Sequence, residues 1–539
     1  MVYTIGNIYI ITTVAVIGGA LFGFDIASMS AMVGDFFKVS LLTARRLSLG
    51  TQQYRCFFNQ TGTNEEGSCG GPTSSTQGGI SAAMPGGSFV GALISGIVTD
   101  WLGRKHAIQV GSVIWCIGSA ISCASFSIAQ LVVGRFINGL SVGILSAQVP
   151  VYVAELAQPS KRGTVVGAQQ WAITWGILIM FYVSYGSSFL EGPSAWRLPW
   201  GLQMVPAVFL FFMIFIMPES PRWLAKHDRW EEAHDVLARV HAKGNHNDAF
   251  VQTELQEIRE MVEFERQNTD ASYLDLFKPN MIYRTHIGMF TQIWSQLTGM
   301  NVMMLYITYV FGMAGLSGNA NLVASSIQYM GPSTPTPHRL NAHDDLDVCQ
   351  RGDHGLVRQA RTPGGLNNTR EQSWDLSDAP AAAKGVIACT YLFVASFAPT
   401  WGPVSWIYPP ELYPLRLRGK AVAVSTASNW IFNFALSYFV PPAFENIKWK
   451  VYLVFGVFCF TMTVHVFFAF PETAGKTLED VDHMFNTPGL KPWKTKVQFQ
   501  HVRQLETGAI QSEKLAAFHE ERAQSVDKEA AGATKAEQV

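Results

Sequence analysis

The sequence predicts an all-α membrane protein built from two similar halves. Hydrophobic residues make up 48% of the 539 residues and charged residues only 15%, whereas roughly 25% is usual for a soluble domain. Apolar runs of about 20 residues recur, and each is long enough to cross the ~30 Å hydrocarbon core as a helix. Short patterns also repeat between the two halves. A net charge of −1 without a basic domain gives no reason to expect a nucleic-acid partner.

Ten apolar runs are predicted to span the membrane, six in the first half of the chain and four in the second. The first six are Ile8 to Met29, Gly79 to Val98, Ala107 to Phe126, Ile128 to Val149, Val165 to Ser187 and Leu198 to Met217. The last four are Thr285 to Phe311, Ala381 to Tyr408, Ala421 to Val440 and Tyr452 to Phe470. The first run lacks a small-residue cleavage site after a basic region, so we expect it to be retained.

The spans divide the chain into four parts. Residues 1–218 form an N-terminal six-helix half, 219–283 a polar linker with helical patterning, 284–486 a C-terminal half and 487–539 a charged tail. Three loops between spans are basic, at Arg104-Lys105, Lys161-Arg162 and Arg416-Arg418-Lys420. The positive-inside rule places these loops, the linker and both termini in the cytoplasm.

The loop after the first span is then expected outside the cell. It contains the glycosylation acceptor Asn59-Gln60-Thr61, and a second acceptor begins at Asn367. Cys56 and Cys69 share the first loop and could pair in an oxidising compartment. The seven cysteines of the chain show no metal-ligand spacing, so no metal site is expected.

The two halves carry copies of one pattern. Glu155-Leu156, followed by Arg162-Gly163, recurs as Glu411-Leu412, followed by Arg418-Gly419, at an offset of 256 residues. Pro218-Glu219 recurs as Pro471-Glu472 at a similar offset. Duplicated halves are typical of secondary transporters, which hold the substrate near the membrane midplane between them.

The second half departs from this plan at residues 331–362, which are rich in Pro, His, Asp and Arg and contain no span. The offset predicts an apolar hairpin there, so two spans, the eighth and ninth, are missing. One explanation is a frameshift or mis-spliced gene model. The other is a natural variant with an external loop at this position.

Several motifs together resemble the sugar-porter branch of the major facilitator superfamily, and the fungal hexose transporters most closely. They are Gly23-Phe24-Asp25, Asp100 to Lys105, Pro150 to Glu155, Pro218 to Arg222, Gln296 to Asn301, Gly402 to Trp406 and Pro471 to Thr473. The resemblance covers about residues 8–330 and 363–486. It implies a major facilitator fold of two six-helix halves, here with about ten clear transmembrane helices, and no cofactor.

Charged residues gather at the predicted cytoplasmic ends of the spans. Pairs that form across the two halves in one state and break in another would bias a rocking motion, and the resemblance implies this gating role. The competing interpretation is that these charges are solvated membrane anchors, each of which contributes little to stability. The predicted gating residues are Asp100, Arg104, Glu155, Arg162, Glu219, Arg222, Glu411, Arg418 and Glu472.

Two charges lie inside predicted spans. Asp25 falls ~25 Å from the cytoplasmic start of its helix and Arg135 ~10 Å below the external start of its own, so both are expected in the outer half of the membrane. Isolated charges there are costly and usually paired. The resemblance implies proton coupling at this pair, and a static structural pair is the alternative.

Binding of a sugar calls for amides that donate and accept, together with an aromatic ring. Intramembrane amides also join helices, and tryptophan is common at membrane interfaces. The resemblance assigns sugar binding to Gln170, Gln292, Gln296, Asn301, Trp406 and Asn429.

The sequence therefore predicts a monomeric, multi-pass plasma-membrane transporter of glucose-like hexoses, driven by protons and working by alternating access. We find no grouping of nucleophile, base and orienter, so no enzyme and no catalytic residue are expected. The alternatives are a facilitative carrier, a non-transporting sugar sensor and an inactive truncated product.

Overall fold

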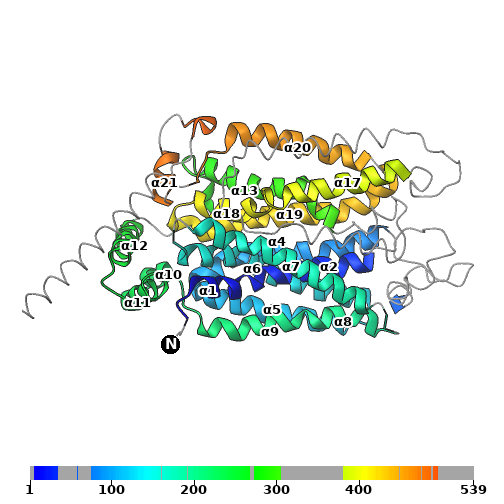
Figure 1. The fold of residues 1–539 in the computed structure, drawn as a ribbon, viewed down its shortest axis with the longest axis horizontal. Coiled ribbons are helices and arrows are strands. Elements are labelled where there is room, and N and C mark those ends of the chain that lie inside the picture. The colour runs from blue at the N-terminus through cyan, green and yellow to red at the C-terminus, as the bar shows by residue number, and fades with distance from the viewer. Residues whose placement is uncertain are drawn as a thin grey trace, which may run out of the picture.

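The computed structural model describes residues 5–33, 57–58, 74–158, 161–187, 189–190, 192–267, 272–304, 380–447, 450–474, 476, 478–486 and 490–495. Every regular element within these ranges is an α-helix or a short 3₁₀ helix, which confirms the all-α prediction for this part of the chain. Figure 1 shows the long helices running side by side, with shorter helices gathered at one end of the molecule.

The first bundle comes from the N-terminal part of the chain. It contains α1 (Ile8–Ala15), α2 (Ile17–Val33), α4 (Ser74–Leu102), α5 (Arg104–Cys123), α6 (Ile128–Leu156), α7 (Arg162–Ser187), α8 (Ser194–Leu202), α9 (Met204–Met213) and η2 (Ile214–Ile216).

The linker follows and forms helices at one end of the bundles, which we call the linker end. They are α10 (Pro221–Lys226), α11 (Trp230–His241), α12 (Ala249–Gln267) and η3 (Tyr273–Phe277). The second bundle contains α13 (Ile282–Leu297), α17 (Pro380–Phe397), α18 (Trp401–Leu412), α19 (Leu415–Ile447) and α20 (Lys450–Ala469). Two short elements, α21 (Leu478–Asn486) and η5 (Pro492–Lys494), complete the described chain, and α21 lies at the linker end in Figure 1.

Eight helical stretches within the described residues are long and apolar enough to cross a membrane. They are Ile8–Ser28, Ser75–Leu102, Arg104–Cys123, Ile128–Leu156, Arg162–Ser187, Ser194–Ile216, Lys384–Leu412 and Lys450–Ala469. The other two of the ten predicted spans correspond to α13, which has 16 residues, and to α19, which has 33.

Several spans predicted as continuous are broken. The first is interrupted at Val16, between α1 and α2, and the sixth at Gln203, between α8 and α9. The span predicted from Ala381 to Tyr408 is interrupted after Phe397, where Pro399 has no N–H to continue the helix. Apolarity marks where the chain crosses the membrane and does not report such local breaks.

The predicted span from Thr285 to Phe311 is also broken. α13 ends at Leu297, and Gly299 has a φ of +85° before helical backbone resumes at Met300. A side chain at Gly299 would clash with the Phe455 ring, because an added Cβ would lie 2.9 Å from it. Residues 305–379, which include the anomalous segment 331–362 and the acceptor at Asn367, lie outside the described residues, as do Cys56, Cys69 and the acceptor at Asn59.

Glycines allow α4 and α6 to pack backbone to backbone. A Cβ added at Gly87 would lie 2.0 Å from the Phe136 carbonyl oxygen, and one at Gly139 would lie 2.1 Å from that of Met84. Close approach of this kind lets dispersion forces hold helices together where lipid gives no hydrophobic drive.

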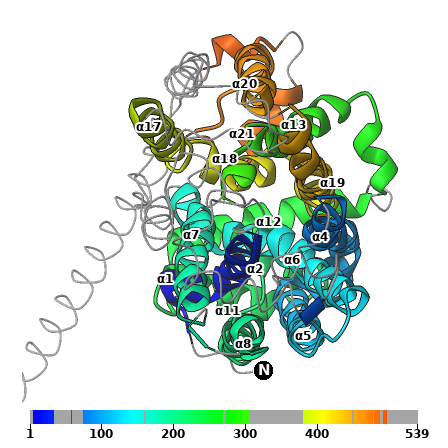
Figure 2. The same cartoon turned by 90° about the vertical axis from the view of Figure 1, so that its right-hand side faces the viewer.

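The two bundles meet mainly where α4 runs along α19 and α7 packs against α18. Figure 2, which views the helices end on, shows the second bundle above the first. Trp430 on α19 is fully buried at this junction, donates to the Ser146 hydroxyl at 3.1 Å and meets Phe22 edge-on at 4.8 Å between ring centroids. Trp430 therefore joins the bundles.

Candidate functional site: a polar pocket between the bundles

The break in α13 brings polar side chains from two helices together. Gln296 donates to the Asn429 side-chain oxygen at 2.8 Å. Its own side-chain oxygen accepts from Asn301 at 2.7 Å and from Asn433 at 3.0 Å. Ser437 extends the network by donating to Asn433 at 3.3 Å. The amides thus satisfy one another, and a polar ligand would have to replace these bonds.

Two other predicted sugar-binding residues form a separate contact between the bundles. The Trp406 indole N–H on α18 donates to the Gln170 side-chain oxygen on α7 at 3.1 Å. Gln292 is buried and donates to the Ser405 carbonyl at 2.6 Å, while its side-chain oxygen has no partner within the described residues. Five of the six predicted residues thus lie in two hydrogen-bonded groups, and Gln292 bonds a backbone carbonyl instead.

The two intramembrane charges lie against each other. Arg135 on α6 donates to both Asp25 oxygens, at 3.2 and 3.0 Å, and its Nε donates to the Ile80 carbonyl of α4 at 3.0 Å. The side chains are 3% and 4% exposed. Each partner of a pair this deeply buried depends on the charge of the other, because a lone buried charge is costly.

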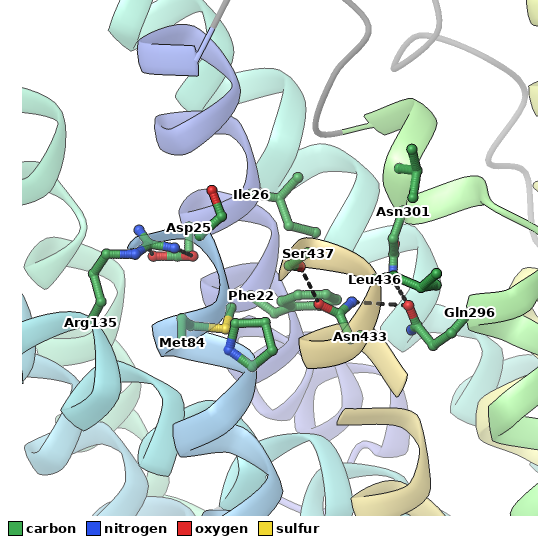
Figure 3. Close-up of a pocket in the computed structure, with 13 residues that line it drawn as sticks. Phe22, Asp25, Ile26, Met84, Arg135, Gln296, Asn301, Asn433, Leu436 and Ser437 are labelled. Atoms are coloured by element: carbon green, nitrogen blue, oxygen red, sulfur yellow. Dashed lines mark hydrogen bonds and ion pairs between the residues drawn. The ribbon is translucent and has the colours of Figure 1, made fainter. Parts of the chain in front are cut away.

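A pocket with a volume of about 40 Å³ connects these groups, which is room for two or three water molecules. In Figure 3 the Asp25–Arg135 pair lies on one side, Gln296, Asn301 and Asn433 lie on the other, and Phe22 and Met84 lie between. Both bundles contribute to its lining, which comprises Phe22, Asp25, Ile26, Ser81, Met84, Pro85, Arg135, Gln296, Asn301, Val302, Asn433, Leu436 and Ser437. Of the predicted sugar-binding residues, Gln296 and Asn301 line it directly.

At the linker end, the predicted gating residues of the first bundle pair mostly with one another. The Arg104 guanidinium makes two bonds to the Glu155 carboxylate, at 3.0 and 3.1 Å, and the Ser220 hydroxyl also donates to Glu155. Glu219 accepts from the backbone N–H groups of Arg104 and Lys105 at 3.0 and 3.1 Å, so it caps the start of α5.

The linker helices are tied to this cluster. Arg222 pairs with Glu254 of α12 at 3.1 Å. Burial raises the pKa of Glu254, but Arg222 and Arg162 outweigh burial and hold that pKa below its usual value. Tyr273 donates to the Leu93 carbonyl of α4 at 2.7 Å, and burial raises the pKa of its hydroxyl to about 12. Tyr273 therefore remains neutral and can serve as a donor.

The gating residues of the second bundle have mainly neutral partners. Glu411 accepts from the Thr473 hydroxyl at 3.0 Å, Arg418 donates to the Tyr413 carbonyl at 3.3 and 3.2 Å, and Glu472 accepts from the backbone N–H of Ala474.

Charges also act between the bundles. Asp100 of α4 pairs with Lys420 of α19 at 3.2 Å. The fields of Arg162 and Arg418 reach Glu411 and Glu155 respectively, each on the opposite bundle. Sequence reasoning placed Lys420 only as a topological anchor and did not single out Ser220 or Glu254. Ser220 could have been found from its position directly after Glu219, whereas no sequence pattern pointed to Glu254.

Two mostly helical bundles around a polar pocket with a buried ion pair define a secondary transporter of the major facilitator fold. Residues 11–331 and 369–485 match the family model "Sugar (and other) transporter". The protein belongs to this sugar transporter family, and it is a multi-pass membrane protein.

Proteins similar to this chain are named as transporters. A high-affinity glucose transporter of Kluyveromyces lactis is 42% identical over 505 residues, which cover 91% of this chain and 87% of the relative. An MFS glucose transporter of Aspergillus flavus is 42% identical over 541 residues, covering 95% and 96%. The solved structure of the proton:xylose symporter XylE, bound to 6-bromo-6-deoxy-D-glucose, superposes with a TM-score of 0.69 at 24% identity, covering 89% of this chain and 99% of that one. This last similarity supports the fold.

Proposed function

We propose that this protein carries glucose-like hexoses across the plasma membrane by alternating access and couples their uptake to protons. The observation that carries the proposal is one pocket between the bundles, lined on one side by the Asp25–Arg135 pair and on the other by Gln296 and Asn301. Its similarity to glucose transporters supports the choice of substrate.

The amides suit a sugar because each can donate and accept hydrogen bonds to neighbouring hydroxyl groups. In the structure Gln296 is hydrogen-bonded to Asn429 and Asn301, and Trp406 is hydrogen-bonded to Gln170. A hexose would take over these bonds, so binding would exchange protein–protein bonds for protein–sugar bonds. The small pocket must widen for this, which requires the bundles to move.

Proton coupling would act through the ion pair. Protonation of Asp25 removes its negative charge and leaves Arg135 without a buried counter-ion. The arrangement of α2, α4 and α6 around the pair would then shift. The proposal is that protonation of Asp25 and binding of sugar together allow the bundles to rock, because Asp25 lines the pocket that the sugar would fill.

The charged network at the linker end would serve as the gate on the cytoplasmic side. The Asp100–Lys420 pair joins the bundles directly, and Arg162 and Arg418 act on carboxylates of the opposite bundle. Arg104, Glu155, Glu219 and Arg222 would hold the first bundle and linker as one body, and Glu411 and Glu472 would belong to the second. Basic loops at this end support a cytoplasmic placement of the linker and both termini.

The remaining assignments complete the proposal. The four parts end at residues 218, 283, 486 and 539, the protein acts as a monomer, and glycans attach at Asn59 and Asn367.

The test is uptake of radiolabelled glucose in cells that lack hexose carriers, with the external pH recorded. We expect accumulation with alkalinisation outside the cells. Asp25→Asn, at the same surface level, is expected to lose sugar-induced alkalinisation and accumulation while retaining exchange of labelled for unlabelled sugar. Accumulation by Asp25→Asn with no proton flux lost would refute coupling at this residue.

The same experiment separates the alternatives. A facilitative carrier would equilibrate glucose with no pH change in the unaltered protein. Absence of uptake by protein at the cell surface would support a sensor or an inactive product, and sugar binding measured on purified protein would distinguish these two.

A further inference from the structure

A serine on α4 faces the pocket with an unused hydroxyl group. Ser81 lines the pocket and is 3% exposed, and its Oγ has no hydrogen-bond partner within the described residues. Serine hydroxyls inside helices commonly donate to the carbonyl four residues earlier, as Ser88 does to Met84 at 3.0 Å on the same helix. The Ser81 hydroxyl makes no such bond, and a buried group without a partner is costly.

The backbone carbonyl of the same residue lacks its usual helical partner. Pro85 lies inside α4, four residues after Ser81, and a proline has no N–H to donate to the carbonyl four residues before it. The Ser81 carbonyl therefore lacks its usual helical donor. Pro85 also lines the pocket. One residue thus offers a hydroxyl that donates and accepts, together with a carbonyl that accepts.

The neighbours of Ser81 place these groups at the centre of the proposed transport chemistry. The preceding carbonyl, that of Ile80, accepts from the Nε of Arg135 at 3.0 Å. From α19, Asn433 and Ser437 line the same pocket (Figure 3). A ligand that fills the pocket would touch α4 of the first bundle and α19 of the second.

We propose that Ser81 binds one specific hydroxyl group of the sugar and helps to determine which sugars are carried. The sugar hydroxyl donates to the Ser81 carbonyl and accepts a hydrogen bond from the Ser81 hydroxyl. This inference rests on the proposed function and adds to it a contact from the first bundle, beside the anchor of Arg135. For a monosaccharide that lacks that one hydroxyl, Ser81 adds nothing to the binding affinity.

The test measures uptake of glucose and of a panel of its deoxy analogues and epimers by Ser81→Ala in cells that lack hexose carriers. We expect KM for glucose to rise about 2- to 12-fold, the range for one neutral hydrogen bond, with Vmax retained. KM for one deoxy analogue should stay unchanged, and Ser81→Thr, which keeps a hydroxyl, should restore most of the affinity. Ser88→Ala is the matched control because its buried hydroxyl bonds within α4, and it should leave the sugar preference unaltered.

Each outcome decides the matter. A loss shared equally by all sugars, or by Ser88→Ala to the same extent, would mean that Ser81 supports only the helix. Unchanged KM for every sugar would mean that water occupies the position, and would overturn this inference while the proposed function stands. Failure of the unaltered protein, at the surface, to carry any sugar would overturn the proposed function and this inference with it.

Discussion

Close packing of α4 against α6 predicts opposite effects for two glycine substitutions on the same helix. In Gly87→Ala the new Cβ would lie 2.0 Å from the Phe136 carbonyl oxygen, whereas ordinary contact begins at 3.4 Å. The two backbones must therefore separate by about 1.4 Å, since neither is a flexible side chain. Overpacking of this kind costs about 1–3 kcal/mol or more. Gly79→Ala, also in α4, meets nothing within 4 Å and should gain about 0.5–1 kcal/mol from helix propensity.

The assay is thermal unfolding of the purified protein in detergent, followed by tryptophan fluorescence and by loss of the monodisperse peak in size-exclusion chromatography. A loss of about 3 kcal/mol corresponds to a midpoint lowered by roughly 6–12 °C if the first bundle unfolds as a unit of about 200 residues. Gly79→Ala should unfold at or slightly above the unaltered midpoint. Equal midpoints for both variants, or a more stable Gly87→Ala, would refute the argument that backbone contact at Gly87 sets helix spacing.

Two further predictions concern the linker end. Burial lowers the pKa of His241 below 6.5, so the docked linker keeps it neutral; its stabilising contribution is present above pH 6.5 and is lost as pH falls below that value. The protection of the α11 amides, corrected for the intrinsic pH dependence of exchange, should therefore fall on acidification. His241→Gln, which cannot titrate, should flatten this protection profile, and a profile unchanged in that variant would contradict the assignment. Lys420→Ala should alter transport only about two-fold, because Asp100 and Lys420 are 34% and 20% exposed and such pairs contribute about 0.2–1 kcal/mol; a ten-fold change in Vmax would show a stronger gate.

Much of the fold was predictable from sequence because membrane insertion depends on local composition. A run of about 20 apolar residues must be helical in lipid, where each backbone polar group needs an internal partner. The breaks were not predictable in the same way. Gly299 has a positive φ, and the Phe455 ring leaves no room for a side chain there; an apolar window reports neither the turn nor that contact.

The candidate site shows the same division. Asp25 and Arg135 were expected to pair because each is an isolated charge at similar depth, and the structure holds them 3.0 Å apart. The amides were expected as a group from their chemistry and from family resemblance. Their separation into a Gln296 cluster and a Gln170–Trp406 contact depends on how the bundles meet. Ser81 gave no signal, because a serine in an apolar helix is common and only its missing partner sets it apart.

By itself the sequence determined that the chain is a helical membrane protein with duplicated halves and the motifs of a sugar porter. These properties depend on composition and on short motifs. The tertiary structure decided which polar groups share one pocket, which charges remain within a bundle and which reach across, as Asp100 and Lys420 do. The physical reason is that these contacts join residues far apart in sequence, and helix packing alone brings such residues within hydrogen-bonding distance.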